Sequence, residues 1–285
     1  MILGAAVRFE KWEALGNDYV IVERAELPWE LTPARIRGIC APHFGVGSDG
    51  ILLLSRPEDR AYVAELRIFN PDGSEAELSG NGAREAALYL RRSGWTDRDR
   101  FSIHTKAGEI RPMIVGVDTA RIELGRASVQ SSDFPSGGPD GSGEVAAAGR
   151  VWRFQHVSIG NPQCVIDAGE DLERLDLAAI GPEISESDLF PNRSNVSFTQ
   201  ADGSHVRARI FERGVGETLS SGTGASGAAV AAFLRGAESP LMVALDGGEL
   251  EVEVSRELDV SLTGTARPVY AGELAPELVG ALEGR

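Results

Sequence analysis

The sequence has little of the residues on which cofactor and metal sites usually depend. Its two cysteines, Cys40 and Cys164, lie far apart, which excludes a disulfide framework and fits a reducing compartment. The only lysines, Lys11 and Lys106, do not sit in a motif suited to a pyridoxal Schiff base. We therefore expect no cofactor and no metal. The four histidines are scattered without the spacing of metal ligands: His43, His104, His156 and His205.

Positive charge and long apolar runs are also scarce. The 285-residue chain has a formal net charge of −15, which argues against nucleic acid and anionic membranes as partners. No apolar run approaches membrane-spanning length, and the opening MILGAAV at 1–7 is too short and lacks the basic region of a signal peptide. We expect a cytoplasmic protein that acts on a small molecule.

One stretch occurs twice in the chain, at residues 67–87 and again at 209–229. A shift of 142 positions places Ser79 on Ser221. Ten of the 21 aligned positions are identical without a gap, where average residue usage would give about one or two by chance. The shift is about half the chain, so the sequence predicts an internal duplication.

Each copy of this stretch predicts a strand, a glycine-rich loop and a helix, in that order. In the first copy the strand ends at Phe69, and small residues at helical spacing begin at Ala83 and continue to the stop at Gly94. Small residues indicate a helix tightly enclosed by other elements. Because a glycine-rich helix entrance exposes backbone N–H groups beside a positive dipole end, each copy predicts an anion cradle next to a serine, Ser79 or Ser221.

A second motif also occurs once in each half. Gly16-Asn17 and the apolar strand after it match Gly160-Asn161 at an offset of 144. Strands outnumber helices along the chain, so the expected class is α+β with two pseudo-symmetric domains. The expected strands include 20–22, 51–54, 63–69, 101–105, 109–115, 120–124, 150–158, 206–211, 241–245, 249–254 and 259–262, and the other expected helices are 33–40, with Thr32 as N-cap, and 172–180.

The two domains are expected to divide the chain near its middle. The segment 134–143 is rich in proline, glycine and serine, and is expected to be a linker or a long surface loop near the boundary. The tail over 267–274 could return to the first half. We therefore place the N-terminal half at 1–125 plus 266–285 and the C-terminal half at 126–265.

A duplicated serine loop suits one kind of chemistry. Two related halves that face each other create a cleft, and clefts between domains are usual ligand sites. A pair of equivalent groups on either side of one carbon can remove a proton from one face and deliver a proton to the other. Two helix N-termini directed at the carboxylate of that carbon would stabilise the developing charge.

With these motifs the chain resembles the diaminopimelate epimerase family over nearly its whole length. The resemblance rests on LGNDY at 15–19, FNPDGSEAELSGNGAR at 69–84, IGNPQC at 159–164, RSNVSF at 193–198 and ERGVGETLSSGTGA at 212–225. It implies two similar domains, each a mixed β-sheet or barrel wrapped around a central helix, and an amino-acid substrate; it also suggests a homodimer. The substrate-binding residues that it implies are Asn17, Asn70, Gly80, Asn81, Asn161, Asn195, Glu212, Arg213, Gly222 and Thr223.

The departures from the family pattern concern the acid/base residues. The family has a cysteine at the start of each glycine-rich loop, where this chain has Ser79 and Ser221. A thiol can be partly ionised near neutral pH, whereas an aliphatic hydroxyl is far less acidic and needs a strong neighbouring base. A histidine usual in the family is Gln163 here, and a glutamine usual after the GxGxD loop is Gly50. Glu212 is the obvious titratable group carried over beside the second serine.

Several interpretations stay open at this stage. Ser79 and Ser221 suit helix N-caps as well as catalysis, and Glu212 with Arg213 suits a structural ion pair as well as a site. The first hypothesis is a cofactor-independent epimerase of LL- to meso-diaminopimelate, with Ser79 and Ser221 at the acid/base positions and Glu212 assisting. The second is an isomerase of another small acid with Glu212 as its main base. The third is a non-catalytic binding protein.

Overall fold

The computed structural model describes residues 6–284 of the chain. The opening residues 1–5, part of the segment where we expected no signal peptide, lie outside the described residues, as does residue 285. The chain divides into two compact units, residues 1–122 with 265–285 and residues 123–264. The halves 1–125 plus 266–285 and 126–265 stay a prediction about the extent of the duplicated segments.

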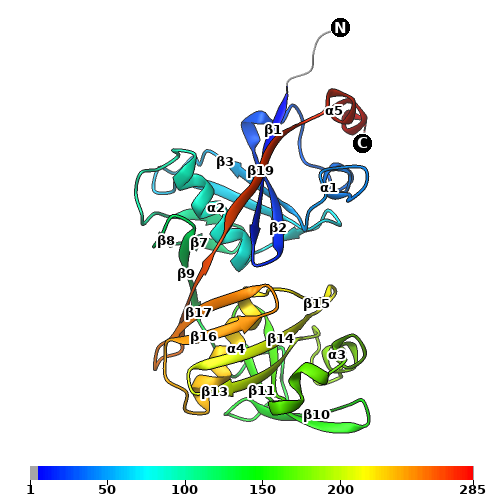
Figure 1. The fold of residues 1–285 in the computed structure, drawn as a ribbon, viewed down its shortest axis with the longest axis vertical. Coiled ribbons are helices and arrows are strands. Elements are labelled where there is room, and N and C mark those ends of the chain that lie inside the picture. The colour runs from blue at the N-terminus through cyan, green and yellow to red at the C-terminus, as the bar shows by residue number, and fades with distance from the viewer. Residues whose placement is uncertain (1–5, 285) are drawn as a thin grey trace. The chain divides into compact units, whose positions relative to one another are not determined.

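A mixed β-sheet forms the first unit (Figure 1). Its strand order is β19-β1-β2-β3-β4-β6-β7, and β5 pairs with β4. The pairs β2/β3 and β4/β6 are parallel and the other pairs are antiparallel. The strand bounds are β1 Val7–Ala14, β2 Asn17–Glu23, β3 Ile51–Ser55, β4 Ala64–Phe69, β5 Glu75–Ala76, β6 Ile103–Thr105, β7 Gly108–Ile110 and β19 Arg267–Leu274.

The second unit repeats this pairing pattern. Its strands follow the order β10-β11-β12-β13-β14-β16-β17-β18, and β15 pairs with β14 as β5 does with β4. The pairs β12/β13 and β14/β16 are parallel, which matches β2/β3 and β4/β6. Such agreement in topology is what duplication of one ancestral unit produces. The strand bounds are β10 Ser142–Ala147, β11 Arg150–Ser158, β12 Pro162–Asp167, β13 Asn195–Asp202, β14 His205–Glu212, β15 Gly216–Thr218, β16 Leu241–Leu245, β17 Gly248–Val254 and β18 Asp259–Thr265.

Each unit contains one long buried helix that follows its serine. Helix α2 is Gly80–Arg92 and helix α4 is Gly222–Leu234 (Figure 1). Every residue of α2 from 80 to 90 is buried, and α4 is buried along almost its whole length. Helix α4 carries mainly glycine and alanine, so strands can approach its backbone closely on several sides. The expected enclosure of these two helices is confirmed.

The connection between the units corrects one expectation. Two extended passages link them, strand β9 (Thr119–Arg126) and the step from β18 to β19. The segment 134–143 is not a linker, because it lies within the second unit, where Phe134 is buried against the rings of Phe154 and Phe190. The other predicted alternative, a surface loop, fits the exposed positions 135, 136, 139 and 140. One aromatic residue therefore anchors a loop whose composition otherwise indicates solvent exposure.

The remaining helices were predicted with mixed success. Helix α1 (Pro33–Cys40) begins where expected, and the Thr32 side chain accepts a hydrogen bond from the Arg35 N–H. The helix expected at 172–180 is wrong in its bounds: a 3₁₀ helix (Gly169–Arg174) precedes α3 (Leu177–Ser185), which has its own N-cap at Asp176. The C-terminal helix α5 (Pro276–Glu283) was not predicted from the sequence.

One predicted strand is two in the structure. The expected strand at 109–115 is divided between β7 and β8 (Pro112–Ile114), because Pro112 has no N–H to continue the ladder. The returning tail is confirmed, since β19 pairs antiparallel with β1. Across residues 6–284, no helix combines the length and the apolar character needed to cross a membrane.

Candidate active site

Ser79 and Ser221 have the same local geometry at the starts of the two buried helices. Both backbones are extended, with φ and ψ of −132° and 123° at Ser79 and −139° and 116° at Ser221. Ser79 Oγ accepts from the Gly82 N–H at 3.1 Å, and Ser221 Oγ accepts from the Gly224 N–H at 3.2 Å. Both serines are therefore N-caps. A hydroxyl that accepts in a cap still carries its own proton, so this role does not exclude catalysis.

The glycine three residues after each serine lies close to a strand side chain of its own unit. A Cβ on Gly82 would lie 2.9 Å from Leu52 Cδ2, and a Cβ on Gly224 would lie 2.7 Å from Ile210 Cδ1. Glycine therefore lets the first helical turn lie directly on the sheet of its own unit. The N–H groups of this turn and the positive end of the helix dipole suit a carboxylate.

An asparagine at the start of a strand contacts each helix entrance. In the first unit, Asn81 Nδ2 donates to Asn17 Oδ1 at 3.1 Å. In the second unit, Asn161 Nδ2 donates to Thr223 Oγ1 at 3.2 Å. The two contacts connect equivalent places in the repeat but run in opposite donor directions. The structure thus brings together Asn17 with Asn81, and Asn161 with Thr223, each pair within one unit.

In the first unit this contact belongs to a longer chain of hydrogen bonds. The buried guanidinium of Arg84 donates from Nη2 to Asn81 Oδ1 at 2.8 Å. At the other end, Asn17 Nδ2 donates to Asp49 Oδ2 at 2.9 Å. The two amides thus form a chain that runs from a cation, Arg84, to an anion, Asp49, and this fixes the orientation of each amide. The network keeps Asn17 and Asn81 in place before any ligand arrives.

In the second unit the asparagine at the helix entrance, Asn161, is bound by the neutral side chain of Gln163. Gln163 Nε2 donates to Asn161 Oδ1 at 2.7 Å, and the Gln163 Oε1 is buried without a hydrogen-bond partner among the described residues. Nearby, Asn195 Oδ1 accepts from the Arg213 backbone N–H at 3.0 Å. The Arg213 guanidinium donates to the Asn192 carbonyl at 2.8 Å.

Two of the predicted site residues are bound inside their own hairpins. Asn70 Nδ2 donates to Ser74 Oγ at 2.9 Å in the turn before β5. Glu212 Oε1 accepts from Thr218 Oγ1 at 2.8 Å across the β14/β15 pair. Gly80 and Gly222 are the first helical residues after the two serines. The assignment of these residues to one site stays a prediction.

Helix α2 contains a buried pair of ionisable residues that was not predicted from the sequence. Arg84 and Glu85 are both fully buried, and both Glu85 carboxyl oxygens lack a hydrogen-bond partner among the described residues. Burial raises the pKa of Glu85 well above its ordinary value, despite the attraction of Arg84. Burial also lowers the pKa of Arg84 to about 10. Burial therefore favours the neutral form of the Glu85 carboxyl next to the Arg84 guanidinium. The pair's only sequence signal was adjacent charges inside a helix of small residues.

Tyr19 is a second residue whose role the sequence analysis did not identify. Its ring is buried on β2, and its hydroxyl donates to Ser79 Oγ at 3.3 Å. Tyr19 belongs to the LGNDY motif, but its distance of 60 positions from Ser79 hid the contact. Only the folding of β2 beside the start of α2 brings the two hydroxyls together.

The two cysteines are buried, and cysteine is among the residue types that bind metals. Burial raises the pKa of the Cys164 thiol well above its ordinary value, and it raises that of Cys40 as well. Cys164 is thus the inert buried thiol that the sequence suggested. Among residues 6–284, no group of three His, Cys, Asp or Glu side chains could hold a metal ion.

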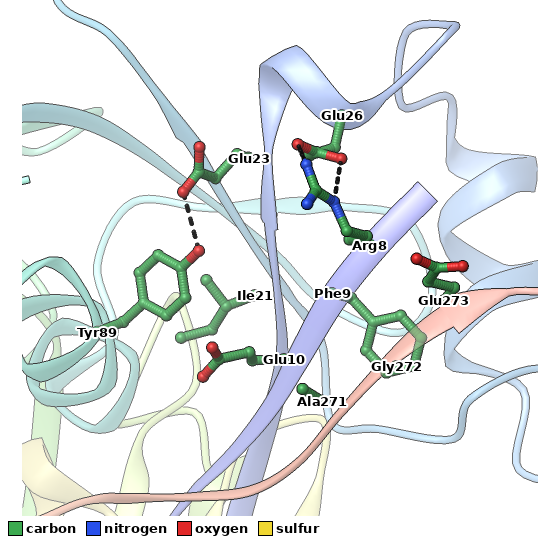
Figure 2. A pocket seen from close by; sticks show the side chains of 10 residues that line it. All are labelled: Arg8, Phe9, Glu10, Ile21, Glu23, Glu26, Tyr89, Ala271, Gly272 and Glu273. Atoms are coloured by element: carbon green, nitrogen blue, oxygen red, sulfur yellow. Dashed lines mark hydrogen bonds and ion pairs between the residues drawn. The ribbon is translucent and has the colours of Figure 1, made fainter. Parts of the chain in front are cut away.

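A surface pocket of about 540 Å³ lies elsewhere in the first unit (Figure 2). Figure 2 shows the Glu23 carboxylate bound to the Tyr89 hydroxyl and the Glu26 carboxylate bound to Arg8; the Glu23–Tyr89 distance is 2.9 Å. None of the predicted site residues, all of which the structure describes, lines this pocket. Because these two carboxylates already have partners within the protein, we do not assign the amino-acid site to it.

Comparison with known sequences agrees with the motifs. A family profile described as diaminopimelate epimerase matches residues 9–130 and 155–269. "Diaminopimelate epimerase 2" of Nostoc sp. (strain PCC 7120 / SAG 25.82 / UTEX 2576) is 38% identical over 278 residues, which cover 95% of this chain and 97% of the relative. The diaminopimelate epimerase of Azoarcus sp. (strain BH72) is 39% identical over 276 residues, which cover 94% and 98%.

Solved structures with low sequence identity share the fold. A hydroxyproline epimerase from Agrobacterium vitis, with bound trans-4-hydroxy-L-proline, aligns with a TM-score of 0.67 at 15% identity and covers 98% of this chain and 96% of its own. A predicted epimerase from Pseudomonas aeruginosa aligns with a TM-score of 0.65 at 17% identity and covers 94% and 99%. These likenesses confirm the expected α+β class with two mixed-sheet domains.

Proposed function

Because the chain belongs to the diaminopimelate epimerase family, we propose that it interconverts LL- and meso-diaminopimelate without a cofactor. The reaction would serve lysine and peptidoglycan precursor synthesis in the cytoplasm. The observation that carries the proposal is the duplicated helix entrance. Ser79 and Ser221 cap their helices with the same backbone angles and the same hydrogen bond, as two equivalent groups that act on one carbon require.

In the proposed mechanism the two serines work on opposite faces of the α-carbon. One serine oxygen takes the α-proton while its own hydroxyl proton passes to a neighbouring base, and the hydroxyl of the other serine gives its proton to the opposite face. The N–H groups at the starts of α2 and α4 hold the α-carboxylate and stabilise the charge that it gains when the proton leaves. Glu212 assists Ser221, since it is the titratable side chain of the matching motif.

The remaining predicted residues bind the rest of the substrate. Asn17, Asn81, Asn161 and Thr223 are already oriented by hydrogen bonds, which lowers the entropic cost of binding. Asn70, Asn195 and Arg213 complete the shell for the amino groups and the distal carboxylate. This division of roles comes from the family resemblance and is part of the proposal.

Solvent exchange tests the proposal directly. The protein is incubated with LL-diaminopimelate in D₂O, and deuterium at the α-carbon is followed by mass spectrometry together with formation of the meso isomer. Incorporation with inversion is the expected result. Binding of diaminopimelate, measured by calorimetry, without any deuterium incorporation would refute the proposed epimerase and favour a non-catalytic binding protein.

A second candidate is an isomerase of another small acid with Glu212 as its main base. Two departures from the family pattern favour it: Gln163 replaces a histidine, and Gly50 replaces a glutamine that belongs to the ligand shell. A panel of small amino and hydroxy acids in D₂O separates the two candidates. Exchange with one of these acids but not with diaminopimelate would select the second.

The proposal also includes a homodimer, with strand β19 as the candidate contact. Val269 and Tyr270 expose 54% and 44% of their surface on this strand, although both have large apolar side chains. Sedimentation velocity of the wild type and of Tyr270→Asp is the test. We expect a dimer that becomes a monomer in the variant, and a monomeric wild type would contradict this part.

A further inference from the structure

The Ser79 oxygen accepts two hydrogen bonds from the protein. One comes from the Gly82 N–H at 3.1 Å, as part of the helix cap. The other comes from the Tyr19 hydroxyl at 3.3 Å. A hydroxyl oxygen has two lone pairs, so both are engaged and the Ser79 proton is left to point elsewhere. An alkoxide at this position would keep both donors.

A missing side chain at Gly50 makes room for the Tyr19 ring. A Cβ on Gly50 would lie 2.7 Å from Tyr19 Cε1 and 2.3 Å from the Phe69 carbonyl oxygen. The ring of Tyr19 therefore lies directly against backbone where any other residue would displace it. The position of the phenol next to Ser79 depends on this glycine.

The second half lacks the equivalent contact. The offset of 144 that matches Asn17 to Asn161 also matches Tyr19 to Gln163. Gln163 donates to Asn161, and its stem packs over α4, where a Cβ on Gly227 would come within 2.9 Å of it. Across the part of the chain that the structure describes, Ser221 Oγ takes part only in its hydrogen bond from Gly224.

This difference matters because serine is a poor acid. An ordinary phenol has a pKa of about 10, far below that of an aliphatic alcohol. When Ser79 gives its proton to the carbanion, it can take the Tyr19 proton in the same step, which leaves a phenolate. In the reverse direction the Cα–H bond breaks, its proton goes to Ser79 Oγ, and the Ser79 proton returns to the phenolate. No oxidant and no further reactant is needed.

We infer that Tyr19 is a positioning residue that acts through Ser79 as a proton relay, and that this relay serves only the first of the two serines. The inference rests on the proposed function, in which Ser79 touches the reacting carbon. It deepens that function by assigning different proton partners to the two faces: Tyr19 behind Ser79, and Glu212 for Ser221.

A comparison of two backgrounds tests the relay. Tyr19→Phe is made in the wild type and in Ser79→Cys, and kcat and KM for diaminopimelate are measured for all four proteins. In the serine background kcat should fall by about 10²-fold with little change in KM. In the cysteine background the loss should be no more than about tenfold, because a thiol ionises without the phenol.

Equal losses of kcat in both backgrounds would show a purely structural role for Tyr19 and overturn the inference. Unchanged kcat in the serine background would overturn it as well. Tyr62→Phe is the matched control, since it removes a phenol hydroxyl from a partly exposed ring elsewhere in the first unit and should leave kcat unchanged. Thermal unfolding of each variant verifies that the fold is intact.

A second readout does not depend on the substrate. The thiol introduced by Ser79→Cys is alkylated with iodoacetamide across a range of pH, with and without Tyr19→Phe. Loss of the phenol hydrogen bond should raise the pKa of this thiol by about one unit, while the buried Cys40 and Cys164 give little background. An unchanged thiol pKa would overturn the inference. A shifted thiol pKa in a protein that never exchanges diaminopimelate would refute the proposed function and leave the Tyr19–Ser79 coupling intact.

Discussion

Helices α2 and α4 begin alike and differ one turn later. In α4 the Ser226 hydroxyl donates to the Gly222 carbonyl at 2.8 Å, and Gly227 follows. In α2 the Arg84 guanidinium donates to the equivalent Gly80 carbonyl at 3.2 Å, and the buried acid Glu85 follows. The same carbonyl is therefore bound by a neutral group in one copy and by a cation in the other.

This comparison separates what the duplication had to keep from what it could change. The N-cap serine and the glycine after it are kept, because the helix start must lie against its sheet with its N–H groups available. The residues one turn later differ: Arg84 and Glu85 in α2, and Ser226 and Gly227 in α4. Helix α2 contains two ionisable side chains, and burying charge is costly. The Arg84 guanidinium, however, orients Asn81, which in turn orients Asn17.

The largest expected effect comes from restoring thiols at the two caps. Ser79→Cys together with Ser221→Cys should raise kcat for diaminopimelate by about 10²–10⁴-fold, because each acid/base group then ionises near neutral pH. The measurement is steady-state epimerisation against the wild type. Single variants sharpen the comparison: if Tyr19 already assists Ser79, Ser221→Cys should give the larger gain. No gain from the double variant would contradict the assignment of the two serines.

The next largest expected effect is a loss of stability when a side chain is placed at Gly50. Gly50→Ala places a Cβ 2.3 Å from the Phe69 carbonyl oxygen, which must move, so we expect a loss of about 3 kcal/mol in the free energy of unfolding. Urea denaturation measures it. Gly280→Ala in α5 is the control: a Cβ there meets no described heavy atom within 4 Å, so the variant should gain about 0.4–1 kcal/mol.

The two central helices should respond differently to loss of the group that binds their first carbonyl. Arg84→Met removes the hydrogen bonds of the guanidinium to Asn81 Oδ1 and the Gly80 carbonyl and should cost about 2 kcal/mol of unfolding free energy, whereas Ser226→Ala should cost about 1 kcal/mol. Arg84→Met should also raise KM, because Asn81 and Asn17 lose their fixed orientation. Equal costs, with KM unchanged in both variants, would mean that the charge in α2 has no role in the site.

The last prediction concerns the pH dependence that Glu85 adds to the stability of the first unit, whereas the equivalent position of α4 is Gly227. The folded protein holds the Glu85 proton above pH 4.5, where the unfolded chain releases it, since the pKa is raised in the folded state. Stability from this group is thus complete below the unfolded pKa and falls as pH rises toward the folded pKa, by about 1.4 kcal/mol per pH unit. Glu85→Gln should remove this slope in urea denaturation series, and an unchanged slope would contradict a protonated Glu85.

Local patterns were sufficient for much of the fold. The duplicated stretch predicted two strand–loop–helix units, and Thr32 before Pro33 predicted the start of α1, because caps and helical periodicity act over a few residues. The helix expected at 172–180 failed for the opposite reason: nothing local shows where a 3₁₀ turn ends and Asp176 starts a new helix. Phe134 illustrates the same limit, since its burial depends on rings distant in the sequence.

The sequence by itself determined the repeat, the two capping serines and membership in the family, since these depend on residue identity and spacing alone. Only the tertiary structure decided which groups support each serine. The Tyr19 hydroxyl reaches Ser79 from 60 positions away, and Arg84 orients an asparagine that in turn orients Asn17. Such contacts arise when strands pack against a helix, and packing is a property of the whole chain that no short motif contains.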